Sequence, residues 1–322
     1  MGLAVIGGSG FIGTELLSQL SNYSARNLDK NPSSLFGDIT TIGDIRNSKV
    51  LSENLKNIQT VILLAAEHKD NVRPSSLYYD VNVQGTQNVL EAMTKNNVKK
   101  IIFTSSAAVY GLSKEKADEK SPLKPFNHYG KSKMEAEKKI ENWQKEDPIN
   151  RDVTIIRPTV VFGERNRGNV YNLFRQINSR RFIMIGDGKN KKSIAYVKNV
   201  AAFIKNRINN SNPGYKIYNY TDGPDLNVKA LVDITNDTLK IKPYTSSHIP
   251  YWLGVLGGVS LDVLGKVTSK DMPLSSIRVK KFCATSQFDS SKAHKLFLAP
   301  YQLEKAIKNT LKFEFLDFPS DN

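Results

Sequence analysis

Residues 2–13 read GLAVIGGSGFIG, and this stretch decides the fold. The mostly apolar residues 2–6 predict a buried strand, and FIGTELLSQL at 11–20 has the apolar spacing of a helix. Gly7, Gly10 and Gly13 lie between and within them, three residues apart. Glycines at this spacing permit a tight turn, close approach of backbone to a pyrophosphate, and close packing of helix on strand. The helix N-terminus adds free N–H groups and a partial positive charge. Glycine-rich turns are common, so the motif needs support from its context.

The rest of the first half supplies that context, because apolar runs alternate with amphipathic stretches. Further strands are predicted at 25–28, 39–42, 60–65, 100–105 and 153–158, and helices near 46–56, 74–96 and 128–146. This alternation predicts an α/β fold, a Rossmann-type doubly wound parallel sheet covered on both faces. We expect residues 1–162 to form the dinucleotide-binding domain, with a return of the chain near 193–205. Residues 163–322 are expected to form a smaller, mainly substrate-binding domain.

Two carboxylates follow predicted strands of the sheet. Asp29 ends the second strand, 16 residues after Gly13. A carboxylate there accepts a hydrogen bond from a ribose 2′-hydroxyl and repels a 2′-phosphate, which favours NAD over NADP. Arg26 and Lys30 lie nearby in the sequence and moderate this preference. Asp44, in GDIR at 43–46, is expected to reach the adenine, to cap the next helix, or to do both.

HYGKSK at 128–133 places Tyr129 and Lys133 one helical turn apart. A free tyrosine has a pKa near 10, so it acts as a base at neutral pH only if its phenolate is stabilised. The Lys133 ammonium and the positive nicotinamide ring of an oxidised cofactor are expected to lower that pKa. A fall of about 3 units corresponds to roughly 4 kcal/mol, which requires a cleft with little water. Without the glycine motif, the pair would be read as an ordinary exposed Tyr and Lys.

FTSSAAVYG at 103–111 follows the predicted fifth strand, at the end of the sheet where ligands of open parallel sheets bind. Ser106 is expected to donate a hydrogen bond to the substrate oxygen that Tyr129 deprotonates. Ser105 is expected to be structural. Both serines have the alternative of simply capping a loop.

Composition limits the partners. Lys and Arg number 46 against 31 Asp and Glu, a net charge of +15, which favours phosphorylated ligands or an anionic lipid surface. No nucleic-acid-binding motif is visible, so we predict no nucleic-acid partner. The one cysteine, Cys283, excludes an internal disulfide and suits a reducing cytoplasm. No signal peptide is recognisable, and we predict no metal site.

The stretch IPYWLGVLGGVSLDVLGKV at 249–267 is strongly apolar. Pro250, four glycines, Asp262 and Lys266 make it a poor membrane-spanning helix. Two interpretations stay open: a buried helix of the second domain, or an apolar face that meets a membrane or a lipid tail.

Taken together, GxxGxxG, LAA (64–66), NVQGT (82–86), SSAAVYG, YGKSK and RPTVVFG (157–163) resemble the extended short-chain dehydrogenase/reductases of the sugar epimerase group. The resemblance runs through nearly the whole chain. It implies a Tyr129 base, a Lys133 that holds the nicotinamide ribose and assists the tyrosine, and a Ser106 that binds the reacting hydroxyl. It also implies the NAD-binding residues Gly7, Gly10, Phe11, Ile12, Gly13, Asp29, Asp44, Ile45, Ala65, Ala66, Asn82, Ser105, Tyr129, Lys133 and Pro158.

Longer stretches, such as EHKDNVRPSSLYYDVNVQGT and RPTVVFGERNRGNVYNLFRQI, resemble the family members that epimerise an N-acetylhexosamine on a polyprenyl diphosphate for bacterial surface polysaccharides. Sugar dehydratases of this superfamily carry an acidic pair where this chain has Ala107 and Ala108, so dehydration is disfavoured. Nucleotide-sugar epimerases show an arginine before an Asp-Phe pair where this chain has Lys192, and lysine cannot bind a diphosphate in bidentate fashion. The expected substrate-binding residues are Ser106, Arg165, Arg167, Asn169, Lys192, Arg278 and Ser286.

The sequence therefore predicts an NAD-dependent 4-epimerase that converts GlcNAc to GalNAc on a lipid-linked diphosphate. We expect a homodimer formed through the helices near 74–96 and 128–146, attached peripherally to the cytoplasmic face of an anionic inner membrane. The alternatives are a soluble UDP-GlcNAc 4-epimerase, a 4-keto-sugar reductase with exchangeable cofactor, and a non-catalytic NAD-binding protein.

Overall fold

The structure is a computed structural model that describes residues 2–69, 72–112, 116–210, 212–242, 249–268 and 276–317, without the side chains of 263–268, 277, 278 and 281. The chain forms two compact units. The first unit comprises Met1–Val161, Ala195–Asp222 and Phe288–Tyr301, and the second comprises Phe162–Ile194, Gly223–Gln287 and Gln302–Asn322. The first unit thus contains two returns of the chain, whereas the sequence predicted a single return near 193–205.

A seven-stranded sheet organises the first unit, in the order β3-β2-β1-β4-β5-β6-β9. Every neighbouring pair of its strands is parallel. The order reverses between β1 and β4, and an open sheet binds ligands beyond the carboxyl ends of its strands at such a point. The strands are β1 (Gly2–Ile6), β2 (Ser24–Asp29), β3 (Thr40–Ile42), β4 (Thr60–Leu63), β5 (Lys100–Thr104), β6 (Asp152–Pro158) and β9 (Gly214–Tyr220).

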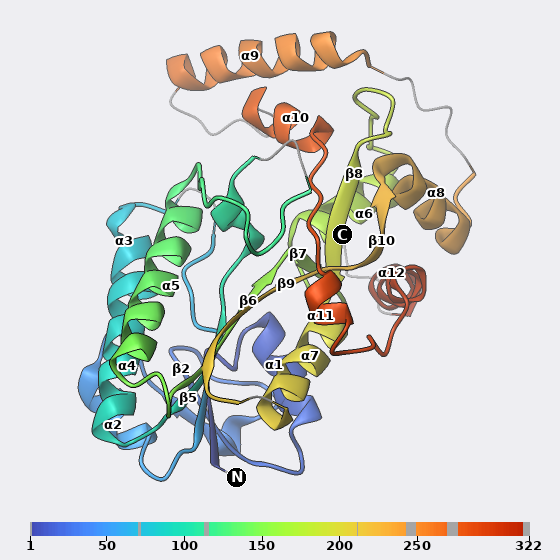
Figure 1. The fold of residues 1–322 in the computed structure, drawn as a ribbon. Coiled ribbons are helices and arrows are strands. Elements are labelled where there is room, and N and C mark those ends of the chain that lie inside the picture. The colour runs from blue at the N-terminus through green and yellow to red at the C-terminus, as the bar shows by residue number, and fades with distance from the viewer. Residues whose placement is uncertain are drawn as a thin grey trace. The chain divides into compact units, whose positions relative to one another are not determined.

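Helices cover both faces of this sheet (Figure 1). On one face, α1 (Phe11–Gln19) and α7 (Val197–Asn209) build a core that includes Leu16, Val200 and Phe203. On the other face, the helices contribute Leu51, Val89 and Ile140 to a second core. These helices are α2 (Ser48–Asn54), α3 (Ser76–Tyr79), the π-turn η2 (Asp80–Gln84), α4 (Gly85–Lys95) and α5 (His128–Glu146). The predicted doubly wound α/β fold is confirmed.

The six strands predicted before residue 160 are all present within a few residues of their predicted bounds. The predicted helix at 74–96 is divided into α3, η2 and α4, because a π-turn interrupts it. The first return, Ala195–Asp222, begins within the range predicted for it, 193–205. Residues 197–209 form a helix on the sheet, and the strand that extends the sheet follows at β9.

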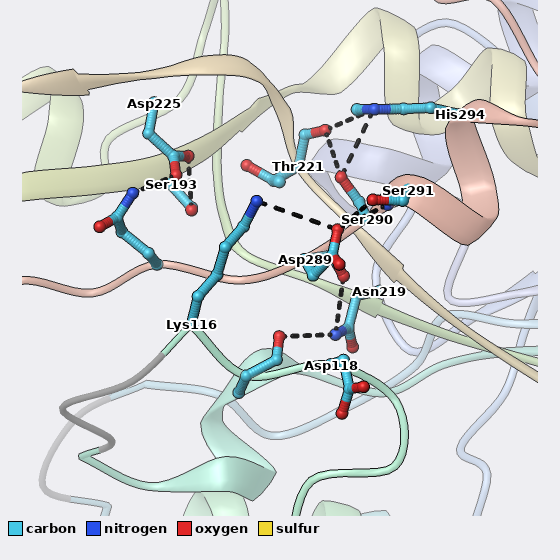
Figure 2. Close-up of polar contacts among 12 residues, drawn as sticks. Lys116, Asp118, Ser193, Asn219, Thr221, Asp225, Asp289, Ser290, Ser291 and His294 are labelled. Carbon is cyan, nitrogen blue, oxygen red and sulfur yellow. Dashed lines mark hydrogen bonds and ion pairs between the residues drawn. The ribbon is translucent and has the colours of Figure 1, made fainter.

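The last return, Phe288–Tyr301, is held at the end of β9 by polar contacts (Figure 2). Asn219 Nδ2 donates to the Asp289 carbonyl at 3.1 Å and to the Ala117 carbonyl at 3.3 Å. His294 Nε2 lies 2.9 Å from the Thr221 carbonyl. The short helix α11 (Ser291–His294) is thereby fixed against β9.

The second unit is mostly helical. Its helices are α6 (Asn169–Asn178), α8 (Val228–Leu239), α9 (Tyr251–Thr268), α10 (Ser276–Cys283), α12 (Leu303–Lys312) and the π-turn η4 (Phe313–Asp317). α8 packs against both α6 and α12, and α9 packs against α10. A small three-stranded sheet in the order β10-β8-β7 comprises β7 (Val160–Phe162), β8 (Lys191–Tyr196) and β10 (Asp222–Asn227). Short 3-10 turns, η1 (Gly37–Ile39) and η3 (Ala107–Tyr110), complete the first unit.

Helix α9 covers the apolar stretch singled out in the sequence. Tyr251, Trp252, Leu253, Leu256 and Val259 are all exposed on it. The interpretation as a fully buried helix is therefore wrong for the described part of α9. Among the described residues, no helix combines the length and apolarity needed to cross a membrane.

Candidate active site

The glycine turn lies at the switch point of the sheet, between the ends of β1 and β4. Gly7 has φ +91°, and a Cβ there would lie 2.4 Å from the backbone nitrogen of Ala65. At Gly13 a Cβ would lie 2.4 Å from the Gly8 Cα, so helix α1 approaches the turn as closely as the sequence predicted. Gly10 differs, because the nearest protein atom to its Cβ position is the Gly7 oxygen at 3.4 Å. No described protein atom crowds Gly10, which leaves space over the turn for a ligand.

Two residues of β2 hold this turn in place. Asn27 Oδ1 accepts a hydrogen bond from Gly8 N at 2.9 Å, and Asn27 Nδ2 donates to Thr40 Oγ1 at 2.9 Å. Asp29 accepts from Ser9 N at 3.0 Å and from Asn31 N at 2.9 Å. The predicted Asp29 carboxylate is thus fixed beside the glycine turn. Asn27 was not predicted, and only its place in β2, two residues before Asp29, pointed to it.

Asp44 follows β3 and forms a tight pair with its neighbour Arg46. Asp44 Oδ1 and Oδ2 lie 2.9 and 2.7 Å from Arg46 nitrogens. The hydrogen bonds from Arg46 hold the pKa of Asp44 below its usual value. The side chain that caps α2 is Asn47, which accepts from the N–H groups of Lys49 and Val50. The prediction that Asp44 caps this helix is therefore wrong, because Asn47 occupies the N-cap position. The adjacent Ile45 is buried, and its Cγ2 lies 2.8 Å from the Cβ position of Gly85.

Asn82 joins the loop after β4 to the start of α5. Its Oδ1 accepts from Glu67 N at 2.8 Å, and its Nδ2 donates to the Glu67 carbonyl at 3.0 Å and to Ser132 Oγ at 2.9 Å. Ser132 Oγ in turn donates to the Tyr129 carbonyl at 2.9 Å. The loop that contains Ala65 and Ala66 is therefore tied to the backbone of the Tyr129 turn. Asn82 has a positioning role that the sequence reading did not specify.

Ser105 and Ser106 follow β5 and behave differently from each other. Ser105 N donates to the Ile156 carbonyl at 2.7 Å, but its buried Oγ has no hydrogen-bond partner among the described residues. Ser106 Oγ accepts from Ala108 N at 3.1 Å and so caps η3. The Ser106 hydroxyl also lies near enough to Tyr129 to lower the pKa of its phenol. Ser106 is therefore both a cap and a neighbour of the tyrosine hydroxyl.

Tyr129 lies in the first turn of α5, which Asn127 caps by accepting from Gly130 N at 2.8 Å. Burial raises the pKa of Tyr129, and the neighbouring Ser106 hydroxyl acts in the opposite direction. The expected fall of this pKa is therefore not produced by the protein side chains alone. By the reasoning from the sequence, it requires the positive charge of an oxidised nicotinamide.

Lys133 is fully enclosed, and its Nζ lies 4.3 Å from the centre of the Phe103 ring on β5. Burial lowers the pKa of Lys133 to about 7, and the charge of Glu137 acts against this fall. A lysine with this pKa gains or loses its charge near neutral pH. The alternative of an exposed surface lysine is excluded by its burial.

A buried ion pair lies behind Lys133, one turn further along α5. Glu137 accepts two hydrogen bonds from Arg157 of β6, at 2.9 and 2.6 Å. Arg157 Nη1 donates to Tyr110 Oη at 2.7 Å, and Tyr110 Oη donates to Asn219 Oδ1 at 2.7 Å. This network joins α5, β6, η3 and β9 behind the predicted catalytic residues. Sequence reasoning missed it, although Glu137 is spaced four residues from Lys133.

The predicted substrate residues belong to the second unit, apart from Ser106. Arg167 Nη1 donates to the buried Glu314 at 2.7 Å and stacks 4.3 Å from the Tyr171 ring. Arg165 has φ 67° and lies 5.5 Å from the Phe313 ring. Asn169 begins α6 after the cap residue Gly168. Arg278 lies in α10, but its side chain lies outside the described residues.

Lys192 and Ser286 are brought together by a bridge between β8 and the segment after α10. Lys192 Nζ donates to the Ala284 carbonyl at 2.6 Å. Burial lowers the pKa of Lys192 to about 8, whereas the Cys283 thiol acts to raise it. The lysine that replaces the family arginine is thus partly enclosed, which strengthens its interaction with an anion when it is charged.

The residues of the first unit fit a bound NAD. The turn leaves space at Gly10, the Asp29 carboxylate lies beside it, and Ser105 offers a buried hydroxyl without a partner among the described residues. Gly7, Phe11 and Ile12 start the turn and α1, where free N–H groups favour a pyrophosphate. Pro158 ends β6 opposite Tyr220 of β9.

The chain belongs to the NAD-dependent epimerase/dehydratase family, whose sequence pattern matches residues 3–220. It therefore uses NAD, as predicted. An N-acetyl-alpha-D-glucosaminyl-diphospho-ditrans,octacis-undecaprenol 4-epimerase of Escherichia coli O157:H7 is 53% identical over 320 residues, which cover 99% of this chain and 96% of the relative. A UDP-glucose 4-epimerase of Vibrio cholerae is 29% identical over 289 residues, or 83% of this chain and 85% of that protein.

Solved structures share the fold. MoeE5 in complex with UDP-glucuronic acid and NAD has a TM-score of 0.75 at 24% identity, covering 97% of this chain and 98% of that one. The UDP-glucose 4-epimerase of Thermus thermophilus in complex with NAD has a TM-score of 0.75 at 18% identity, with coverage of 97% and 98%. The predicted Rossmann-type fold is thereby confirmed a second time.

Proposed function

We propose that this protein is an NAD-dependent sugar 4-epimerase that interconverts GlcNAc and GalNAc on undecaprenyl diphosphate. The observation that carries this proposal is the 53% identity to the Escherichia coli enzyme along nearly the whole of both chains. The arrangement of Ser106, Tyr129 and Lys133 supports it, since the Ser106 hydroxyl neighbours Tyr129, and the enclosed Lys133 follows Tyr129 one turn later on α5. Such an activity belongs to the synthesis of bacterial surface polysaccharides.

In this mechanism Tyr129 removes the proton from the sugar 4-hydroxyl, while Ser106 donates a hydrogen bond to the same oxygen. NAD held by the glycine turn and Asp29 would supply the acceptor for the C4 hydride and the source of its return, so that each cycle would need no outside oxidant. The 4-keto sugar then turns over in the site, and Tyr129 returns its proton to the oxygen as the opposite face of C4 is reduced. Lys133 holds the ribose and stabilises the phenolate. The neutral Ala107 and Ala108 offer no acid for loss of a hydroxyl, which disfavours a dehydratase.

For the lipid-linked diphosphate, the chain offers cations other than the family arginine. Lys192 and Ser286 lie together, and Arg165, Arg167 and Asn169 precede or begin α6. Lysine neutralises a phosphate as a point charge, without the bidentate geometry of arginine. This substitution supports a substrate other than a nucleotide sugar. The net charge of +15 further supports peripheral attachment to the anionic cytoplasmic face of the inner membrane.

We also propose a homodimer through α4 and α5. The residues of these helices that line a shared groove are Gln87, Leu90, Glu91, Thr94, Lys95, Lys139, Asn142, Trp143 and Glu146. Charges of both signs in this groove allow complementary pairing between two copies. Light scattering at micromolar concentration is expected to give about twice the 36.0 kDa of one chain. A monomer at every concentration tested would reject this interface.

The substrate is tested with purified protein and no added cofactor. We expect conversion of undecaprenyl-diphosphate-GlcNAc to its GalNAc epimer, with little turnover of UDP-GlcNAc. Comparable turnover of UDP-GlcNAc would instead support the soluble epimerase. A requirement for added NAD(P)H and a net reduced product would support the 4-keto-sugar reductase.

A further inference from the structure

Helix α9 presents one apolar face that no described residue covers. Trp252, Leu256 and Val259 are 61%, 55% and 45% exposed, and their spacing of four and three residues places them on one side of the helix. Tyr251 and Leu253 are also exposed at the start of the helix. None of residues 251–261 is charged. Exposed aromatic and aliphatic side chains gathered in this way mark an interaction surface rather than ordinary surface composition.

The opposite side of α9 is fixed to the second unit. A Cβ at Gly254 would lie 2.5 Å from Ile185 Cγ2 and 3.5 Å from Val279 Cγ1 of α10. Gly254 and Gly258 are buried on this side. The Ile249 backbone bonds to Met184 and Gly186 just before α9 begins. The glycine side is therefore the packed side of α9, and the side with Trp252 faces outward.

Basic side chains lie on the segments that pack against α9. Lys280 is exposed on α10, next to the buried Val279. Arg180 and Arg181 are exposed in the segment leading to Ile185, and the ring of the intervening Phe182 lies 6.2 Å from Phe282 of α10. None of these three cations forms a salt bridge with a described residue. Figure 1 shows α9 and α10 side by side.

We propose that the outward face of α9 inserts into the interface of an anionic phospholipid bilayer, with Arg180, Arg181 and Lys280 against the lipid headgroups. A helix with an apolar face that includes tryptophan, bordered by cations, is typical of proteins that lie on a membrane without crossing it. The inference rests on the proposed function, because a polyprenyl diphosphate substrate keeps its tail in such a bilayer.

The charges favour a bilayer over a second copy of this chain as the occupant. In a symmetric contact each copy presents the same surface, so a second copy would bring an uncharged helix and further cations, and no complementary anions, to this face. An anionic headgroup layer is complementary to them. The same cations make vesicle binding sensitive to salt, while the apolar face provides a component that salt does not remove.

Tryptophan fluorescence can report insertion of α9, because the chain has only two tryptophans. Trp143 is 5% exposed, whereas Trp252 is 61% exposed on the proposed membrane face. Vesicles of phosphatidylcholine with about one third phosphatidylglycerol are expected to shift the emission of the full-length protein to shorter wavelength. Trp252→Phe is expected to abolish the shift while vesicle binding remains. An unchanged emission of the wild-type protein on vesicles that it binds would overturn the insertion of α9.

Vesicle flotation measures the contribution of the face itself. Trp252→Ser with Leu256→Ser is expected to lower the partition coefficient at least about tenfold, because the apolar area that enters the interface is lost. The matched control is Ile149→Ser with Leu298→Ser, two side chains that are 81% and 93% exposed in the first unit. This control is expected to bind as wild type. Equal binding by both double variants and wild type would overturn the proposal.

Two further measurements separate the alternatives. Sedimentation in the absence of vesicles shows whether a second copy covers α9. Self-association of the wild type that is lost in the Trp252/Leu256 variant would show that a second copy covers α9. If neither protein then floats with vesicles, the proposal is overturned. Turnover of a short-chain, water-soluble diphosphate-linked GlcNAc is expected to be unchanged in the Trp252/Leu256 variant. Vesicle binding through α9 without any turnover would leave the inference intact and reject the proposed function, whereas turnover without vesicle binding would do the reverse.

Discussion

Replacing Lys133 by methionine tests the electrostatics of the site most sharply. Burial lowers the pKa of Lys133 from 10.5 in the unfolded chain to about 7 in the folded protein. At about 1.4 kcal/mol per pKa unit, keeping this lysine in the fold costs about 4 kcal/mol at pH 7 and about 2 kcal/mol at pH 9. The cost is fully present below the folded pKa and disappears above the unfolded pKa. Lys133→Met removes the charge that lies over the Phe103 ring and keeps an unbranched side chain at this position.

We therefore expect Lys133→Met to be more stable than the wild type at pH 7 without cofactor, and to have lost its epimerase activity. The gain in free energy of unfolding should shrink as the pH rises from 7 to 10, because the wild-type lysine then becomes neutral in both states. Urea denaturation at pH 7, 8 and 9 measures this change, with the exposed Lys131→Met on the same helix as control. A difference in free energy of unfolding between variant and wild type that stays constant with pH would refute the reasoning. A variant less stable than the wild type at pH 7 would also refute it.

Three further changes probe the other parts of the site. Tyr129→Phe should retain NAD and lose at least about 100-fold in epimerisation, because the ring remains and the general base is gone; activity within a few-fold of wild type removes Tyr129 from the mechanism. Asp29→Ala should weaken NAD retention and relax discrimination against NADP, measured as the cofactor released on denaturation. Glu137→Ala should destabilise the fold by about 3–5 kcal/mol, because the buried Arg157 loses its carboxylate partner. The control Glu141→Ala breaks a partly exposed ion pair with Lys145 and should cost under about 1 kcal/mol.

The strands of the sheet were predictable because their signal is local. Apolar runs such as TVIL in β4 are buried on both faces, and each is bounded by polar or turn residues. The glycine turn was predictable for the same reason, as Gly7 and Gly13 meet backbone atoms that a side chain would overlap. Local sequence patterns were therefore enough to predict most of the sheet and the glycine turn.

The polar network behind Lys133 was not predictable, because its members are far apart in the sequence. Arg157 pairs with Glu137 across 20 residues, and Tyr110 bonds to Asn219 across 109. Nothing in a single sequence shows which buried charges face one another. The cap of α2 is a local ambiguity, because Asp44 and Asn47 lie three residues apart and both have capping side chains. For α9, composition shows that a helix is apolar and not which of its sides is covered.

The most direct test of the central claim uses undecaprenyl-diphosphate-GlcNAc labelled with deuterium at C4, purified protein and no added cofactor. If the hydride leaves C4 and returns to the opposite face within one site, the GalNAc product keeps its deuterium at C4 and none reaches the solvent. Formation of GalNAc that has lost the label, or no conversion of the lipid-linked sugar at all, would contradict 4-epimerisation through a 4-keto sugar with retained NAD.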